Sequence, residues 1–315
     1  MNFSVPEPDL VLELGNILNQ LVEQGHLDQS TAEQCMAKRP LAASKQALHP
    51  LEIIADQQLD DLKRPGKKLN LEMLTQWLAD WAGQPYMRID PLKIDVAAVT
   101  PLMYYAFAQR HQILAVAQDS TSVNIVSAQP FVRSWETNLA HVLRREIRRM
   151  VANPEDIRRF TTEFYRLAQS VSGASGQEYS GSGTGNFEQL LRLGAADQEP
   201  DDNDAHIVNI VDWLFQYAFQ QRASDIHIEP RREQGKVRFR IDGVLHTVYQ
   251  FPPQVTLAVI SRLKTLGRMN VAEKRKPQDG RIKTSTPDDQ EIELRLSTLP
   301  TAFGEKMVMR IFDPD

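Results

Sequence analysis

Cysteine is almost absent from this sequence, because Cys35 is the single cysteine among 315 residues. An internal disulfide is therefore excluded, and so is a metal site built from several cysteine thiolates. No run of about 18 apolar residues occurs, and the start, MNFSVPEPDL, lacks a basic region followed by an apolar stretch. We therefore expect a water-soluble protein of a reducing cytosol that neither spans a membrane nor carries a secretion signal.

The sequence also lacks an excess of basic residues, since the formal net charge is -5 at pH 7. A general nucleic-acid binder would carry a basic excess to meet the phosphates, so that class of protein is not expected. The charge is uneven, however, with arginines concentrated in residues 131–170 and acidic residues in 186–212. With 42% hydrophobic residues the chain can build two or three cores, and the charge asymmetry favours separate modules.

Residues 1–169 are predicted to form a helix-rich region with a small sheet, which one interpretation divides into 1–65 and 66–169. In residues 70–83, Asn70 is a suitable N-cap, Gly83 a suitable end, and Trp77 and Trp81 are spaced as helix core residues. QILAVA (112–117) and SVNIVSA (122–128) are separated by the turn-like QDST, which predicts a β-hairpin.

The strongest basic cluster is Arg144, Arg145, Arg148 and Arg149 in NLAHVLRREIRRMVA (138–152), which we predict to be helical. One interpretation is a surface for an anion or an acidic partner, and the other is an ordinary solvated helix face. Residues 170–203 follow as a predicted flexible linker, because SVSGASGQEYSGSGTG is dominated by Gly and Ser. Its GSGTG lacks the preceding strand, the following helix and the lysine of a phosphate-binding loop.

Residues 204–315 are predicted to form an α+β domain in which one sheet face packs on helices and the other stays polar. Helices are expected at about 205–221 and 253–266, and Asp242-Gly243 is a strong two-residue hairpin turn. Strands are expected at SDIHI, KVRFRID, VLHTVYQF, GRIKTS, EIELRLST and EKMVMRIF.

In RASDIHIEP (222–230), alternation places Asp225, His227 and Glu229 on one strand face. A metal site would need a further ligand, and an acid-base pair would need a nucleophile or cofactor signature that is lacking. The third interpretation is electrostatic, because Arg238 and Arg240 on the next strand can pair with the two carboxylates. Likewise, Arg295 and Arg310 are either solvated arginines or rigidly held phosphate-binding groups.

Four motifs in fixed order carry a resemblance to a known family. ASDIHIEP (223–230), VRFRIDGVL (237–245), AEKRKPQDGRI (272–282) and LRLSTLPTAFGEKMVMRI (294–311) resemble the second N-terminal domain of the traffic ATPases of type II secretion and type IV pili. LTQWLADWAGQPYMRIDPLKID (74–95) looks like the family's more variable N-terminal domain.

The resemblance implies a PAS-like antiparallel sheet with two helices over 204–315, which sits against the catalytic domain of a neighbouring subunit in a cytoplasmic hexamer. Residues matching Arg295 and Arg310 act there as fingers toward the ATP phosphates. By the same resemblance, Asp225, His227, Glu229, Arg238, Arg240 and Asp242 hold strands and the interdomain surface. The N-terminal domain would dock on a cytoplasmic part of an inner-membrane platform protein, which makes Arg144, Arg145, Arg148 and Arg149 candidate contacts.

The sequence departs from the family in lacking the phosphate-binding loop G-x-x-x-x-G-K-[ST]. Gly66-Lys67 and Gly235-Lys236 have Asp61 and Pro230 where the first loop glycine is required. ATP and Mg²⁺ would therefore be bound mainly by a catalytic domain that follows IFDPD in the family. We expect these 315 residues to hydrolyse no ATP by themselves, so the alternative function is a stand-alone docking or regulatory module.

Some relatives bind cyclic di-GMP through paired helical repeats of the form LG…L…G. ELGNILNQLVEQGHL (13–27) resembles one copy, whereas HPLEIIADQQLDDL (49–62) lacks the Leu-Gly pair of the second. Cyclic di-GMP is therefore a further candidate ligand by this resemblance.

Overall fold

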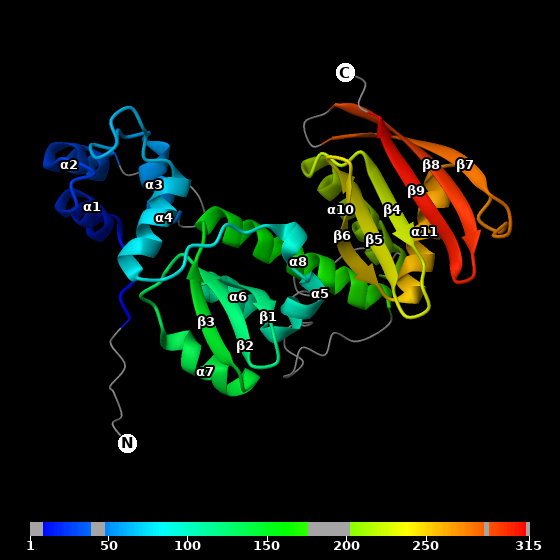
Figure 1. Cartoon of the computed structure of the whole chain (residues 1–315), viewed down its shortest axis with the longest axis horizontal. Helices are drawn as coiled ribbons and strands as arrows, with labels where there is room; N and C mark the ends of the chain where they lie inside the picture. The colour runs from blue at the N-terminus through cyan, green and yellow to red at the C-terminus, as the bar shows by residue number, and fades with distance from the viewer. Residues whose placement is uncertain (1–8, 39–47, 176–201, 287–289, 313–315) are drawn as a thin grey trace. The chain divides into compact units, whose positions relative to one another are not determined.

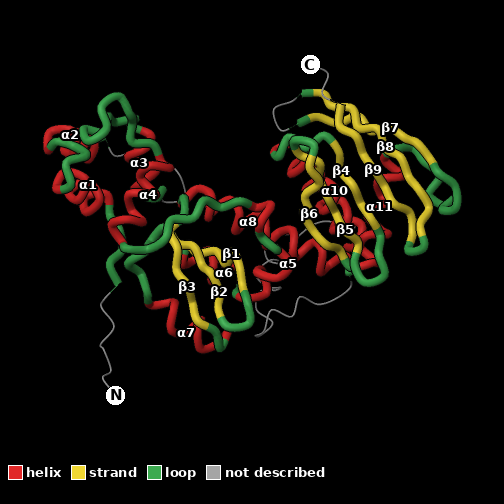
Figure 2. Tube along the Cα trace, viewed as in Figure 1, coloured by secondary structure: helices red, strands yellow, loops and turns green. Residues whose placement is uncertain are grey.

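The computed structural model describes residues 9–38, 48–175, 202–286 and 290–312. The chain divides into two compact units, one of residues up to Glu163 except 95–97 and the other of Phe164–Asp315 with Asp95–Ala97. Each unit is described by itself below. Figure 2 shows helices, strands and loops in distinct colours. Among the described residues, no helix has the length and apolar character needed to cross a membrane.

The first unit begins with four helices that share one core. They are α1 (Leu14–Glu23), α2 (Gln29–Ala37), α3 (Pro50–Asp56) and α4 (Leu71–Ala82). Asn70 accepts a hydrogen bond from the Met73 amide at 2.9 Å, and Gly83 ends α4 in the left-handed conformation. Trp77 is buried in the core and its ring lies 5.3 Å from that of Trp81. The caps and the core position of the tryptophans therefore confirm the sequence prediction for α4.

Short elements then lead into a three-stranded sheet. They are η1 (Pro91–Lys93), α5 (Val96–Val99), η2 (Thr100–Leu102), α6 (Tyr105–His111), β1 (Ile113–Gln118), β2 (Ser122–Ser127), α7 (Ser134–Leu143) and β3 (Glu146–Val151). The antiparallel β1–β2 pair confirms the predicted hairpin. The sheet order is β1-β2-β3, and α7 connects β2 to β3, which runs parallel to β2.

The prediction of one helix through residues 138–152 is wrong from Arg144 onward. Arg144 takes a left-handed backbone conformation with φ 52° as the C-cap of α7, and residues 146–151 pair with β2. A short apolar pattern such as Ile147, Met150 and Val151 fits either a helix or a strand. The pairing of these residues with β2 therefore determines that they form a strand. The next helix, α8 (Pro154–Ala174), extends into the predicted linker, and residues 176–201 lie outside the described part of the chain.

The second unit is built on one antiparallel sheet of six strands in the order β6-β5-β4-β9-β8-β7 (Figure 1). They are β4 (Asp225–Glu229), β5 (Gly235–Ile241), β6 (Val244–Phe251), β7 (Gln278–Ser285), β8 (Glu291–Thr301) and β9 (Gly304–Phe312). The helices are α10 (Asp202–Gln220) and α11 (Pro253–Leu266). All six predicted strands and both predicted helices are present, which confirms the α+β class.

Both helices cover the same face of this sheet. Ile226, Phe239 and Met309 are fully buried on that face, and the Phe239 ring lies 5.6 Å from Tyr217 of α10. Asp242 and Gly243 have φ of 48° and 80°, as the predicted two-residue turn between β5 and β6 requires. The helix-covered face therefore forms the core, and the other face presents the alternate residues of each strand.

Candidate functional site: the polar face of the six-stranded sheet

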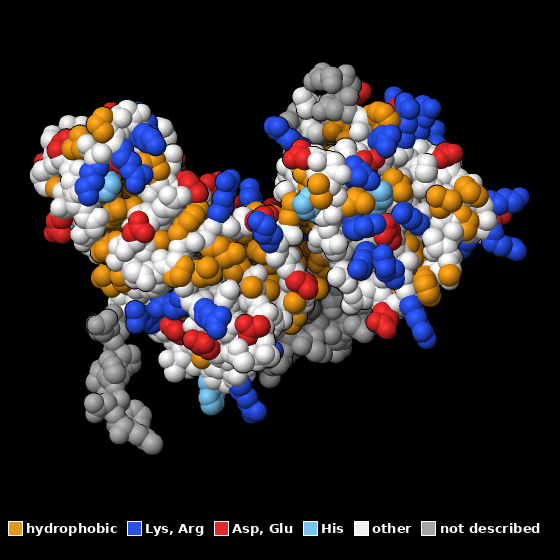
Figure 3. All heavy atoms as spheres, viewed as in Figure 1, with side chains coloured by type: hydrophobic (Ala, Val, Ile, Leu, Met, Phe, Trp, Pro, Cys, Tyr) orange, Lys and Arg blue, Asp and Glu red, His pale blue; other side chains and the backbone are white. Residues whose placement is uncertain are grey.

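A single row of charged side chains crosses five strands on the face opposite the helices. The register places Arg240 of β5, Asp225 of β4, Arg310 of β9, Arg295 of β8 and Arg281 of β7 directly opposite one another in turn. Directly opposed residues of antiparallel strands share a face, so all five belong to the polar face. Figure 3 shows Lys and Arg side chains gathered over this sheet.

Asp225 lies within the row between two arginines. Arg310 Nε donates to Asp225 Oδ1 at 3.0 Å, Arg240 Nε lies 3.2 Å from Oδ2, and the Ser224 hydroxyl donates to Oδ2 at 2.8 Å. Burial opposes ionisation of this carboxyl, but the Ser224 hydroxyl and the two guanidinium groups outweigh it and lower the pKa of Asp225. Asp225 is therefore a carboxylate that joins β4 to β5 and to β9.

Glu229 occupies the equivalent place at the other end of β4. Its Oε1 lies 2.5 Å from Arg238 Nη2 and 2.9 Å from Lys306 Nζ, and Arg231 approaches Oε2 at 3.6 Å. Burial raises the pKa of this carboxyl, yet the hydrogen bonds from Arg238 and Lys306 outweigh burial and bring the pKa to about 2. The cross-strand pairing expected of Arg238 and Arg240 with the two carboxylates is therefore present.

His227 lies between the two carboxylates and is 9% exposed. Neither ring nitrogen has a hydrogen-bond partner among the described residues. Burial and then the charge of Lys306 lower the pKa of His227, while the nearby Asp225 opposes this effect. The environment therefore favours the neutral form of His227, whose ring nitrogens are buried.

The polar positions of β4 are not solvated, although a wet strand face was one way to interpret their alternation. Asp225, His227 and Glu229 are all buried, because the longer basic side chains of β5 and β9 lie over them. Among the residues that the structure describes, no group of three or more His, Cys, Asp or Glu side chains is arranged to hold a metal ion. Their assignment as structural residues stays a prediction, as does that of Asp242 at the β5–β6 turn.

Arg295 and Arg310 lie in the exposed part of the row. Their side chains are 56% and 66% exposed, and within the described residues Arg295 pairs with Glu293 at 3.1 Å and Arg310 pairs with Asp225. The Arg295 guanidinium also lies over the Phe312 ring at 4.3 Å from its centroid. The two guanidinium groups therefore lie on neighbouring strands of a rigid sheet with room for a ligand on the solvent side.

The basic cluster of the first unit does not form one surface. Arg149 packs inward, pairs with Glu136 at 3.4 Å, donates to the Pro130 carbonyl and lies over the Trp135 ring. Arg145 donates to Gln118, whereas Arg144 and Arg148 are exposed, the latter 3.7 Å from Glu146. The helix-face interpretation of the cluster is therefore wrong, because these residues belong to a helix end and a strand.

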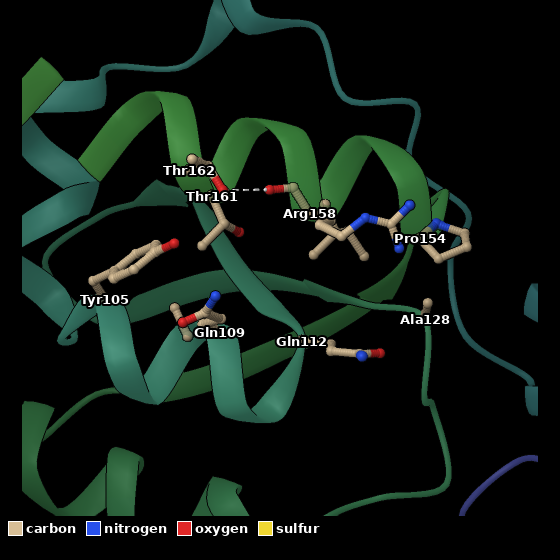
Figure 4. A pocket seen from close by; sticks show the side chains of 10 residues that line it. Tyr105, Gln109, Gln112, Ala128, Pro154, Arg158, Thr161 and Thr162 are labelled. Carbon is tan, nitrogen blue, oxygen red and sulfur yellow. Dashed lines mark hydrogen bonds between the residues drawn. The ribbon is translucent and has the colours of Figure 1, made fainter. Parts of the chain in front are cut away.

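A pocket of about 380 Å³ lies between α6 and α8 in the first unit (Figure 4). Tyr105 and Gln109 line it from α6, and Arg158 and Thr161 line it from α8. Thr161 Oγ1 is buried without a hydrogen-bond partner among the described residues. The Arg158 guanidinium is engaged by both carboxylate oxygens of Glu52 at 3.1 Å, so the pocket contains no uncommitted arginine.

Sequence reasoning missed two residues of the polar face. Lys306 was not singled out, although it completes the environment of Glu229, and Arg281 was not singled out, although it continues the row beyond Arg295. Both fall at the outward-facing, polar positions of predicted strands. The alternation therefore predicts that their side chains lie on the polar face, but it does not predict which residues of the neighbouring strands lie opposite them.

Two protein-family models match parts of the chain. The model described as "Type II/IV secretion system protein" matches residues 200–315, and the model described as "MshEN domain" matches residues 82–171. The first match includes the entire six-stranded sheet and its polar face.

Two curated relatives align with most of the chain. The type IV pilus assembly ATPase TfpB of Acinetobacter baylyi is 53% identical over 269 residues, which cover 85% of this chain and 46% of the relative. The type IV pilus assembly ATPase PilB of Myxococcus xanthus is 31% identical over 246 residues, which cover 76% of this chain and 42% of the relative. The chain thus spans less than half of the length of these relatives.

A solved structure described as "Structure of MshE with cdg" aligns with 49% of this chain and 99% of its own. The sequence identity is 16% and the TM-score is 0.32. This likeness is too low to support an argument about fold or ligand.

Proposed function

We propose that the chain belongs to the type II/IV secretion system protein family and is the N-terminal portion of a hexameric ATPase that powers type IV pilus assembly or type II secretion. Pilus assembly is the favoured role, because the two relatives that align with 85% and 76% of the chain are both named as pilus assembly ATPases. The proposed location is the cytoplasm, with attachment to the inner membrane through a platform protein.

In the proposed motor, Arg295 and Arg310 contact the phosphates of an ATP molecule that a neighbouring subunit's catalytic domain holds together with Mg²⁺. The observation that carries this proposal is their direct opposition on β8 and β9, with both side chains more than half exposed. Arginine suits this role because its planar, permanently charged fork can meet two phosphate oxygens at once. Two such groups would stabilise the charge that develops during phosphoryl transfer.

The test is the ATPase rate of the longer protein that contains this segment. Arg295→Ala and Arg310→Ala are each expected to lower kcat by roughly 10² to 10³-fold. Arg232→Ala, in the exposed turn between β4 and β5, is the matched control and is expected to leave kcat unchanged. If kcat of Arg295→Ala or Arg310→Ala stays within about twofold of the unmodified protein, that residue does not have the phosphate-contact role.

Partner docking is a second part of the proposal, and the exposure of each basic residue supports its assignment. We assign the contact to the exposed Arg144 and Arg148 with the half-buried Arg145, and not to Arg149, which is occupied by Glu136 and Trp135. An acidic segment of the platform protein fits this charge. Arg144→Glu with Arg148→Glu is expected to abolish co-purification with the platform protein, and retained co-purification would exclude the assignment.

Cyclic di-GMP binding by residues 13–27 stays a prediction from their sequence pattern. In the structure these residues form α1 and the turn at Gly25, whose φ is 75°. A calorimetric titration of the purified chain with cyclic di-GMP tests it, and heats equal to the buffer blank would end the hypothesis.

A further inference from the structure

The row on the polar face places three arginines side by side at its solvent-exposed end. Arg310, Arg295 and Arg281 are directly opposed on β9, β8 and β7. Strands in a sheet lie about 4.8 Å apart, and like charges opposed at this spacing lower stability. An arrangement that costs stability in the free protein is expected where a bound anion offsets the repulsion.

The three arginines differ in the partners that they already have. Arg310 is held by Asp225, and Arg295 is held by Glu293 and lies over Phe312. The Arg281 side chain is exposed, and no side-chain hydrogen bond or ion pair joins it to another residue in the described part of the chain. Within the described residues, the donors of its guanidinium group are therefore not used by another side chain.

The backbone beneath Arg281 is tightly positioned, although β7 is an edge strand. Gly280 packs so closely that an added Cβ would lie 2.5 Å from the carbonyl oxygen of Gly267. Ile282, on the other side of Arg281 in the strand, is 7% exposed and anchors β7 from the helix-covered face. Arg281 is thus presented from a fixed position rather than from a loosely held edge, which lowers the entropic cost of binding.

The acidic side chains nearest the row, Asp225, Glu293 and Asp279, are each engaged by a neighbouring group. Asp225 lies between Arg240 and Arg310 and is 4% exposed, so its charge is balanced inside the sheet. Glu293 and Asp279 lie beside the row at the β8–β7 end, where Arg295 and the Ser297 hydroxyl respectively engage them. The donors not yet saturated therefore concentrate at Arg310, Arg295 and Arg281.

We propose that Arg281 is a third phosphate-contacting arginine, and that Arg281, Arg295 and Arg310 together bind the linked phosphates of a nucleoside triphosphate. This inference rests on the proposed role of Arg295 and Arg310 and adds to it a residue and a ligand preference. Because the row is linear, it favours a chain of phosphates over a single inorganic phosphate.

The experiment is isothermal titration calorimetry of the purified 315-residue chain at low ionic strength, with tripolyphosphate, ATP, adenosine and inorganic phosphate as separate ligands. Tripolyphosphate and ATP are expected to bind at least about tenfold more tightly than inorganic phosphate, and adenosine is expected not to bind. Tripolyphosphate that binds no more tightly than inorganic phosphate would overturn the inference.

The variant that tests Arg281 is Arg281→Ala, with Lys283→Ala as its matched control. Lys283 lies on the same strand and face, two residues along, and is opposed to Glu293 rather than to an arginine. Arg281→Ala is expected to weaken tripolyphosphate binding by about tenfold, and Lys283→Ala by less than about twofold. Equal weakening by both variants would indicate diffuse attraction and would overturn the inference, as would unchanged affinity of Arg281→Ala.

Failure of this inference can be told apart from failure of the proposed function. If Arg295→Ala and Arg310→Ala weaken tripolyphosphate binding but Arg281→Ala does not, only the third contact is wrong. If none of the three weakens binding and the ATPase rates of the longer protein are also unaffected, the phosphate-contact role of the row is wrong altogether. Circular dichroism of each variant confirms that the sheet is retained before either conclusion is drawn.

Discussion

Arg310 and Asp225 lie directly opposite each other on β9 and β4, and Arg310 Nε donates to Asp225 Oδ1 at 3.0 Å. The residue proposed to contact ATP is therefore held by a buried carboxylate in this conformation. The hydrogen bond uses Nε, and the remaining donors of the guanidinium group stay available on the solvent side. Asp225 thus positions Arg310 without consuming its capacity for a phosphate.

Replacing Asp225 by Asn removes the charge that Arg240 and Arg310 share while keeping the side-chain shape. Because both arginines are partly exposed and can be hydrated, we expect the free energy of unfolding to fall by roughly 1–2 kcal/mol. Urea denaturation measures this change, and Glu233→Gln in an exposed turn is the control. A variant as stable as the unmodified chain would show that Asp225 does not hold the strands.

Glu229 is expected to make the stability of the second unit depend on pH in the acid range. Its folded pKa of about 2 lies below the ordinary value of 4.5. The contribution of Glu229 to the free energy of unfolding is therefore complete above pH 4.5 and is lost as pH falls toward 2. For this side chain, which is 10% exposed, the loss amounts to roughly 3 kcal/mol. In Glu229→Gln, unfolding free energies measured between pH 5 and pH 2 are expected to fall less steeply, whereas exposed Glu291→Gln retains the slope.

His49 is expected to stay neutral well below the usual range of histidine. Its Nδ1 accepts from the Leu51 amide at 3.2 Å and its Nε2 lies 3.0 Å from the Ala128 carbonyl, which together require the tautomer protonated on Nε2. Burial lowers the pKa of His49 to about 4. Its contribution to stability is therefore complete above pH 6.5 and lost as pH falls through 4. A proton NMR titration of the His49 ring with its midpoint near 6.5 would contradict this.

Lys264 and Glu305 form a buried ion pair between α11 and β9. The ammonium lies 2.8 and 2.9 Å from the two carboxylate oxygens and donates to the Glu273 carbonyl at 2.7 Å, and the two side chains are 1% and 5% exposed. Removing one partner leaves an unpaired buried charge, so Lys264→Met or Glu305→Leu is expected to cost about 3–5 kcal/mol.

The double variant, Lys264→Met with Glu305→Leu, is expected to cost clearly less than the sum of the single changes, because it leaves no buried charge behind. Guanidinium denaturation of the four proteins in this cycle measures the coupling. Additive single effects would show that the two residues act independently.

Much of the fold followed from local chemistry. Asn70 and Gly83 mark the two ends of α4, because a capping side chain and a left-handed residue satisfy the backbone hydrogen-bonding groups at helix ends. Asp242-Gly243 predicted its hairpin because few residue pairs accept two consecutive positive φ angles. Arg144 had no such signal, since an arginine adopts the left-handed conformation rarely, and the end of α7 was therefore missed.

The sequence by itself determined which residues of each C-terminal strand face the core and which face away, because side chains in a strand alternate with a period of two. Only the tertiary structure decided that β9 inserts between β4 and β8, which brings Arg310 to Asp225 across 85 residues of sequence. Strand order depends on how the whole sheet buries its apolar face against α10 and α11, and no local pattern encodes it. The alignment of Arg281, Arg295 and Arg310 is a consequence of that order.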